Sequence, residues 1–244
     1  MSSFLNIISF AFIPVVAAIL GSIYATFRPP SPVARSYIQH LAAGVVFSVV
    51  AVELLPDITK HHNAYVEVTI GFLLGVGTMV GLRTFSHHLE SKNGSHGRPV
   101  GLLVGVAVDI LLDGFLIGVA FAAGDNQGRL LTLALTLELL SLGLAVASAL
   151  GKTEPNKRTI ILTTVLLFPI IVVGAGLGAL LIQYIPPSIM EEVLSFGLAA
   201  LLYLVTEELL VEAHKEPESP MATATFFIGF LVFLLLGMKL TAPV

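Results

Sequence analysis

The sequence predicts an all-α, polytopic membrane protein: a single transmembrane domain, residues 1–244, with eight membrane-spanning helices. Hydrophobic residues make up 56% of the chain, and charged residues make up only 11%. Soluble domains contain about 25% charged residues. The mean hydropathy is +0.95. So few polar side chains cannot cover the surface of a water-soluble globule, which argues against a cytosolic enzyme or a secreted domain.

Eight stretches of the chain are each apolar over the length of about 20 residues that a helix needs to cross a bilayer. Segments rich in proline or glycine separate them, for example 28–32, 94–99 and 217–220. Pro56 is expected to end the second span, and Pro169 is expected to kink the sixth. The predicted spans are about 4–27, 36–55, 66–84, 100–123, 129–150, 159–183, 189–212 and 221–240.

Lysine and arginine are distributed unevenly over the predicted loops. The first, third, fifth and seventh loops hold nine of the twelve, and the other side holds three. The short loops and compact length predict a multi-pass protein of the inner or plasma membrane, and cationic loops remain in the cytoplasm during insertion. Its 85–99 loop would lie in the cytoplasm and both termini on the extracytoplasmic side. The sixteen acidic residues outnumber the basic ones, which argues against a nucleic-acid partner.

The sequence offers little for an enzyme. Cysteine is absent, which excludes disulfides, thiolate metal sites and cysteine nucleophiles. An intramembrane aspartyl protease needs two aspartates, usually from different helices, that share a proton, whereas Asp109 and Asp113 share one predicted span. No Gly-x-Ser-x-Gly or His-Glu-x-x-His pattern occurs. We therefore expect neither an enzymatic activity nor a prosthetic group.

Several acidic residues lie inside the apolar runs, and no lysine or arginine lies deep in any of them. An isolated charge at mid-bilayer costs at least about 2.5–3.5 kcal/mol. The carboxyl groups must therefore be protonated and hydrogen-bonded to neighbouring helices, in contact with water, or bound to a cation. Those in the middle of a span are Asp109, Asp113, Glu138, Glu207 and Glu208, while Glu53 and Glu67 lie near span ends.

The spacing of three of these acids favours cation binding. Asp109 and Asp113 are four residues apart and share one helix face, with about 5–6 Å between their Cβ atoms. Two carboxylates at that distance can converge on one ion. Glu138 lies in the next span, with Ser141 on the same face. The alternative is that these groups are protonated and only hold helices together.

Histidines allow two interpretations in each place. Three lie in the predicted 85–99 loop and two in the loop after the second span, where they are either solvated or a low-affinity metal collector. His40 begins the second span and His214 ends the seventh, where each is either structural or a ligand on a metal path. The loop histidines are His61, His62, His87, His88 and His96.

A short internal similarity links the second and seventh spans. Residues 52–57 read Val-Glu-Leu-Leu-Pro-Asp, and residues 207–212 read Glu-Glu-Leu-Leu-Val-Glu. These spans would correspond if spans one to three and six to eight formed an inverted repeat around spans four and five, a recurring transporter plan. Chance similarity in an apolar background is the alternative.

Four segments resemble the ZIP family of divalent-metal transporters. Residues 109–118 are similar to its His-Asn-x-x-Asp/Glu-Gly-x-x-x-Gly motif, and residues 138–145 to its His-Glu-x-Pro-Glu-Gly-x-Ala motif. Residues 44–57 resemble its glycine-rich second helix, and residues 199–212 its seventh. The resemblance covers the whole chain. It implies a ZIP-like bundle in which one group of helices slides against another, like an elevator, and carries the metal on spans four and five.

The chain departs from that family at its metal ligands. Asp109 and Glu138 stand where the family often has histidine, Ile110 replaces the asparagine, and Leu139 and Leu142 replace two acids. The resemblance then implies one all-oxygen site, with the second site of a binuclear centre lost. The implied metal residues are Asp109, Asp113 and Glu138, with Glu207 and Glu208 as an inner relay and Glu53 in place of a histidine near one mouth.

Ligand chemistry widens the range of expected substrates. Carboxylate and water suit magnesium, calcium and manganese, whereas imidazole suits zinc, iron and copper. We expect a divalent cation, zinc or manganese first, with magnesium, calcium and iron open, and the lipid bilayer as the other partner. A homodimer also stays open. The alternative function is a non-transporting sensor or scaffold that kept this fold.

Overall fold

The computed structural model describes residues 4–59, 64–92, 100–186, 189–215 and 220–241, and all regular structure in these ranges is helical. Eight helical stretches are long and apolar enough to cross a membrane, which confirms the predicted all-α polytopic fold. Five of these stretches are uninterrupted helices. They are α1, Phe4–Phe27; α4, Tyr65–Lys92; α5, Val100–Ala123; α6, Asp125–Leu150; and α11, Pro220–Thr241.

The other three stretches are interrupted. The second consists of α2, Pro32–Val49; the π-helix η1, Val50–Leu54; and α3, Leu55–Thr59. The sixth consists of α7, Lys157–Leu167; α8, Ile170–Leu181; and the 3₁₀ turn η2, Ile182–Tyr184. The seventh consists of α9, Met190–Tyr203; the π-helix η4, Leu204–Leu209; and α10, Leu210–Ala213.

Most predicted boundaries agree with the structure to within a few residues, but the second span begins earlier than expected. It starts at Pro32 rather than near residue 36 because Ser31 caps the helix: its side chain accepts a hydrogen bond from the Ala34 amide at 3.2 Å. Proline at the first helical position fits, because that amide would have no helical partner.

Replacing Ser31 with alanine is expected to lower the free energy of unfolding by about 1 kcal/mol, the usual value of an N-cap side chain. Thermal unfolding of the purified protein in detergent measures the change. Ser9→Ala is the matched control, because Ser9 is exposed and only bonds back to Leu5 of its own helix. An equal shift in both variants would contradict the capping role.

Pro56 was expected to end the second span, and the structure corrects this. Pro56 lies inside the helix, directly after the η1 turn. A proline in a helix clashes with the carbonyl four residues earlier, here Val52, and cannot donate to it. The wider π turn separates the two groups, with the Leu55 amide donating to the Val50 carbonyl five residues back. In the sixth span Pro169 does interrupt the helix, between α7 and α8, as expected.

The third span, Tyr65–Phe85, agrees with the prediction, but the helix that contains it is longer. Helix α4 continues to Lys92, so the expected loop at 85–99 starts later, and residues 93–99 lie outside the described part of the chain. His96, His61 and His62 lie outside it as well, and the side chain of His87 is not described, so their proposed collector role stays a prediction.

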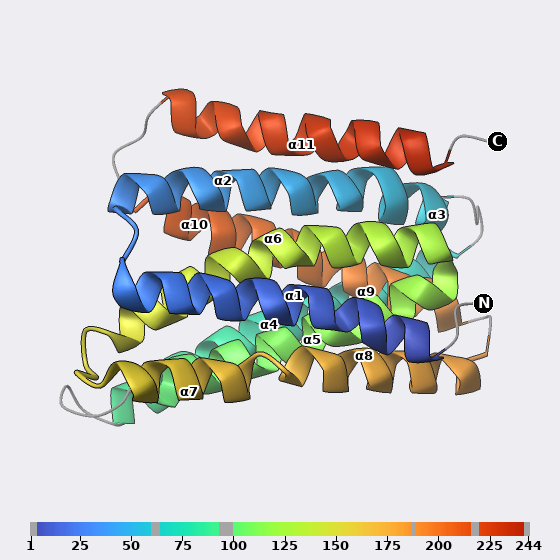
Figure 1. Cartoon of the computed structure of the whole chain (residues 1–244). Coiled ribbons are helices and arrows are strands. Elements are labelled where there is room, and N and C mark those ends of the chain that lie inside the picture. Colours follow the sequence, from blue (N-terminus) through green and yellow to red (C-terminus); the bar gives the residue numbers. More distant parts are fainter. Residues whose placement is uncertain (1–3, 60–63, 93–99, 187–188, 216–219, 242–244) are drawn as a thin grey trace.

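Four helix pairs pack most extensively: α1 with α6, α5 with α8, α2 with α11, and α4 with α9. Figure 1 shows α11 beside α2 at one edge of the bundle and α7–α8 beside α5 at the other. Each pair has glycine at the contact. A Cβ on Gly21 of α1 would lie 2.7 Å from the Leu140 carbonyl oxygen of α6, and one on Gly229 of α11 would lie 2.5 Å from that of Leu41 in α2.

The same close approach holds the other two pairs together. A Cβ on Gly118 of α5 would lie 2.5 Å from the Ala175 carbonyl oxygen of α8, and one on Gly75 of α4 would lie 2.7 Å from that of Phe196 in α9. Small residues at such positions let helices approach until their backbones touch, which is how helices gain packing energy in lipid. Gly77 and Gly81 have no neighbour within 4 Å at the Cβ position, so only one glycine face of α4 is used for packing.

The pairing agrees with the inverted plan that the sequence similarity suggested. The inverted plan exchanges the first span with the sixth, the second with the seventh, the third with the eighth and the fourth with the fifth. Under this exchange, the contact between α1 and α6 corresponds to the contact between α8 and α5. The same exchange turns α2–α11 into α9–α4, so all four close pairs map onto one another. The two π-helices, η1 and η4, also occupy corresponding spans. In Figure 1, α1 begins and α11 ends at the same end of the bundle.

Candidate cation site between α5 and α6

Three carboxylates meet where α5 packs against α6. Asp109 and Asp113 come from successive turns of α5, and Glu138 comes from the middle of α6. One oxygen of each lies within 4.8 Å of the others. The sequence placed the two aspartates on one face, and the structure brings the glutamate of the next span to that face.

The site is largely buried, with Asp109 partly exposed, and it has no compensating charge among the residues that the structure describes. Asp113 and Glu138 are 3% and 2% exposed. Among the described residues, Asp113 Oδ2 and Glu138 Oε2 have no hydrogen-bond partner, and no described lysine or arginine forms an ion pair with the cluster. Buried carboxylates normally have a hydrogen-bond partner or a counter-charge. A group of neighbouring carboxylates with unsatisfied oxygens is therefore suited to a cation.

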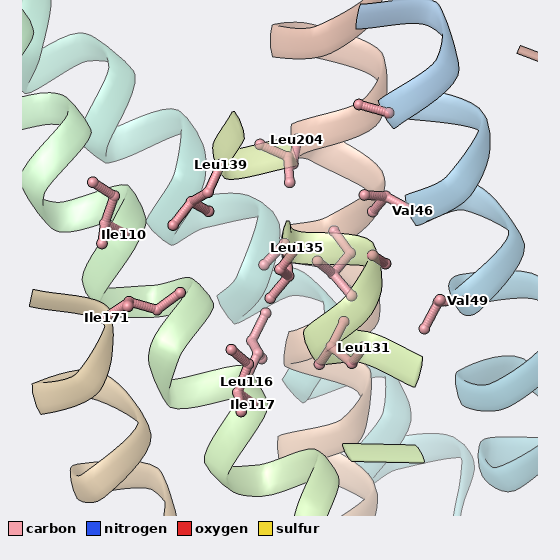
Figure 2. Packing of buried hydrophobic residues seen from close by; sticks show 14 of the residues in the cluster. Val46, Val49, Ile110, Leu116, Ile117, Leu131, Leu135, Leu139, Ile171 and Leu204 are labelled. Carbon is pink, nitrogen blue, oxygen red and sulfur yellow. The ribbon is translucent and has the colours of Figure 1, made fainter. Parts of the chain in front are cut away.

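Apolar core residues adjoin the cluster along α5 and α6. Figure 2 shows Ile110 of α5 and Leu139 of α6, each the chain neighbour of a cluster residue, packed with Leu135 in the core. All three are fully buried. A low-polarity environment of this kind strengthens the attraction between carboxylates and an ion.

Glu208 is a fourth carboxylate near the cluster. It belongs to the π-helix η4 and is partly buried. Its charge interacts with those of Asp109, Asp113 and Glu138. It lies outside the group of three converging oxygens, so it stands beside the site rather than in it.

Glu207 points elsewhere. Its Oε2 accepts a hydrogen bond from Arg83 Nη1 of α4 at 2.6 Å, and both side chains are nearly half exposed, 46% and 45%. Arg83 also donates to the Tyr203 hydroxyl at 3.4 Å. The two consecutive glutamates of η4 thus face different directions, as their adjacency in a helix implies, and the structure does not bring Glu207 to the cluster.

Glu53 lies apart from the cluster as well. It is buried, 5% exposed, in η1 of the second span. A Cβ on Gly237 of α11 would lie 3.5 Å from Glu53 Oε1, on the side where α2 packs on that helix. Ser141, which the sequence placed on the Glu138 face, is buried on α6 one turn from that residue.

No family model matches the chain, and no curated protein matches it.

Proposed function

We propose that this chain is a divalent-cation permease of the ZIP type, with Asp109, Asp113 and Glu138 as the ion site at mid-membrane. One observation carries the proposal: three carboxylate oxygens lie within 4.8 Å of one another, with Asp113 and Glu138 buried, Asp109 partly buried, and no described cationic side chain paired with them. A divalent ion would neutralise most of the cluster's charge and satisfy its oxygens. Carboxylate ligands of this kind replace part of an ion's hydration shell.

The helix packing supports movement of the site as a unit. The fourth and fifth spans carry the cluster, and close glycine contacts attach them to the sixth and the first. The second and eighth spans form one further tight pair, and the third and seventh form another. A group of spans one, four, five and six sliding past the rest would carry the ion across the bilayer in an elevator-like way. In this proposal both termini are extracytoplasmic and the membrane is the inner or plasma membrane.

Uptake into proteoliposomes tests the proposal. Zinc, manganese, magnesium and calcium are offered in parallel to vesicles with the native protein or with Asp113→Asn. We expect uptake of at least one ion, zinc or manganese first, and reduction of that uptake to the level of empty vesicles in the variant. The asparagine keeps the shape of the side chain but removes the charge.

No uptake of any of the four ions would contradict the permease and favour the non-transporting sensor or scaffold. Equal uptake by the native protein and Asp113→Asn would contradict the cluster as the ion site. An ion-binding sensor would still show cation-dependent stabilisation that Asp113→Asn removes, so the two assays together separate these functions.

A further inference from the structure

A groove runs along the surface of the bundle between the third and seventh spans. Its volume is about 460 Å³, within the range of about 300–1,000 Å³ that small-molecule sites have. One wall consists of Phe72, Val76 and Val80, which recur at every fourth residue and so share one face of α4. Ala199 and Leu202 of α9 form the opposite wall. This part of the groove is therefore apolar.

The two walls end at a polar group. Arg83 follows Val80 on the same face of α4, and its Nη1 donates to Glu207 Oε2 at 2.6 Å and to the Tyr203 hydroxyl at 3.4 Å. Thr206 also lines this end. The Arg83 and Glu207 side chains are 45% and 46% exposed, so each has a side that its partner does not cover. A cation and an anion thus lie together at one end of an apolar groove.

The charged end lies at the membrane depth where lipid headgroups begin. Arg83 lies two residues before the end of the third span, Tyr65–Phe85. Phe72, the first α4 residue of the groove, comes eleven residues earlier. At 1.5 Å per residue the groove is about 16 Å long, close to half of a hydrocarbon core about 30 Å thick. The groove therefore has the length of the acyl chains of one leaflet.

The two charges select among lipid headgroups. A phosphate accepts hydrogen bonds from a guanidinium, which has five N–H donors, and a carboxylate accepts a short charge-assisted bond from an ammonium group. A headgroup with both a phosphate and a primary ammonium therefore matches Arg83 and Glu207 together. A purely anionic headgroup would place a second negative charge near Glu207, and a quaternary ammonium has no N–H to donate to it.

We propose that the groove between α4 and α9 binds a zwitterionic phospholipid of the phosphatidylethanolamine type. The phosphate binds Arg83, the ammonium binds Glu207, and one acyl chain lies along the apolar walls. Glu207 belongs to η4, as does Glu208 beside the carboxylate cluster, so the lipid contacts the turn that carries both glutamates. Lipid binding requires neither a metal ion nor transport, and the proposal is therefore independent of the permease.

Native mass spectrometry of the full-length protein measures bound lipid directly. The protein is purified in detergent, freed of lipid, and titrated without divalent cations. The probes are phosphatidylethanolamine, phosphatidylcholine and phosphatidylglycerol with identical acyl chains. We expect the first phosphatidylethanolamine to bind about tenfold more tightly than either of the other lipids, the factor that one charge-assisted hydrogen bond gives.

Two variants test the two parts of the site. Arg83→Gln is expected to weaken phosphatidylethanolamine binding about tenfold, whereas Arg129→Gln is not, because Arg129 lies over the Phe10 ring at the start of α6. Val80→Trp fills the groove from an exposed position and is expected to weaken binding with both charges kept, so it tests the site even where Arg83→Gln unfolds. Leu73→Trp is its control, since Leu73 is exposed on α4 but does not line the groove.

Equal affinity of the native protein for the three lipids would overturn the proposal. Unchanged phosphatidylethanolamine binding in Val80→Trp, or an equal loss in Leu73→Trp, would also overturn it, because the lipid would then lie outside the groove. The same spectra report another occupant: a dimer without lipid that Val80→Trp dissociates would assign the groove to a second copy of the chain.

Discussion

Replacing Asp113 with asparagine is expected to abolish the thermal stabilisation that a divalent cation gives to the native protein. A ligand at one hundred times its dissociation constant stabilises a protein by about 2.7 kcal/mol, and this gain should disappear when the central carboxylate of the cluster loses its charge. Asp113 is 3% exposed and has a carboxylate oxygen that lacks a hydrogen-bond partner among the described residues. Water therefore cannot take over as a ligand without opening the core. Glu138→Gln is expected to act in the same way, since Glu138 is 2% exposed.

The measurement is unfolding temperature against zinc and manganese concentration in detergent, at constant ionic strength. Glu207→Gln is the matched control, because Glu207 belongs to the same membrane-embedded class but pairs with Arg83 outside the cluster. We expect the control to keep the full cation-dependent shift. A loss of the shift in Glu207→Gln, or its persistence in Asp113→Asn, would show that the ion binds elsewhere.

Gly114→Ala is expected to destabilise the protein by about 3 kcal/mol or more, the upper end of overpacking effects. A Cβ at this position would overlap the Ile171 carbonyl oxygen of α8. The obstacle is backbone rather than a flexible side chain, so only separation of the two helices can relieve it. Because α5 carries Asp109 and Asp113, such a separation is also expected to weaken cation binding.

Gly77→Ala and Gly81→Ala provide the control, because a Cβ there meets nothing within 4 Å. These changes are expected to be neutral or to stabilise by up to about 1 kcal/mol, the difference in helix propensity between alanine and glycine. Unfolding in a series of denaturing detergent mixtures measures all three variants. Equal stability of Gly114→Ala and Gly77→Ala would contradict the close α5–α8 contact.

The sequence alone was sufficient for the fold class and for the number of spans. Apolar runs of about 20 residues leave the backbone no alternative to a helix in lipid, so composition determines the secondary structure. Boundaries were harder to predict where a local contact outweighs the general pattern. The Ser31 cap moved the start of the second span, and the π turn before Pro56 let the helix continue through a proline.

Part of the candidate site could also be predicted from the sequence. Asp109 and Asp113 share a face because they are four residues apart on one helix, a relation that no tertiary contact can change. The adjacency of Glu207 and Glu208 in a helix also predicts that their side chains point in different directions. The sequence could not predict which of them faces inward, because that depends on how the seventh span packs against α4 and the rest of the bundle.

Only the tertiary structure decided which distant residues meet. It brought Glu138 to the two aspartates, directed Glu207 to Arg83, placed Glu53 near Gly237 and put His40 beside His214. These relations depend on which helices are neighbours and on their rotation about their own axes. In lipid that choice comes from close packing and not from hydrophobicity, and hydrophobicity is what a run of apolar residues reveals. The sequence by itself thus determined how many helices cross the membrane and which carry acids, and the packing of those helices determined which acids form a site.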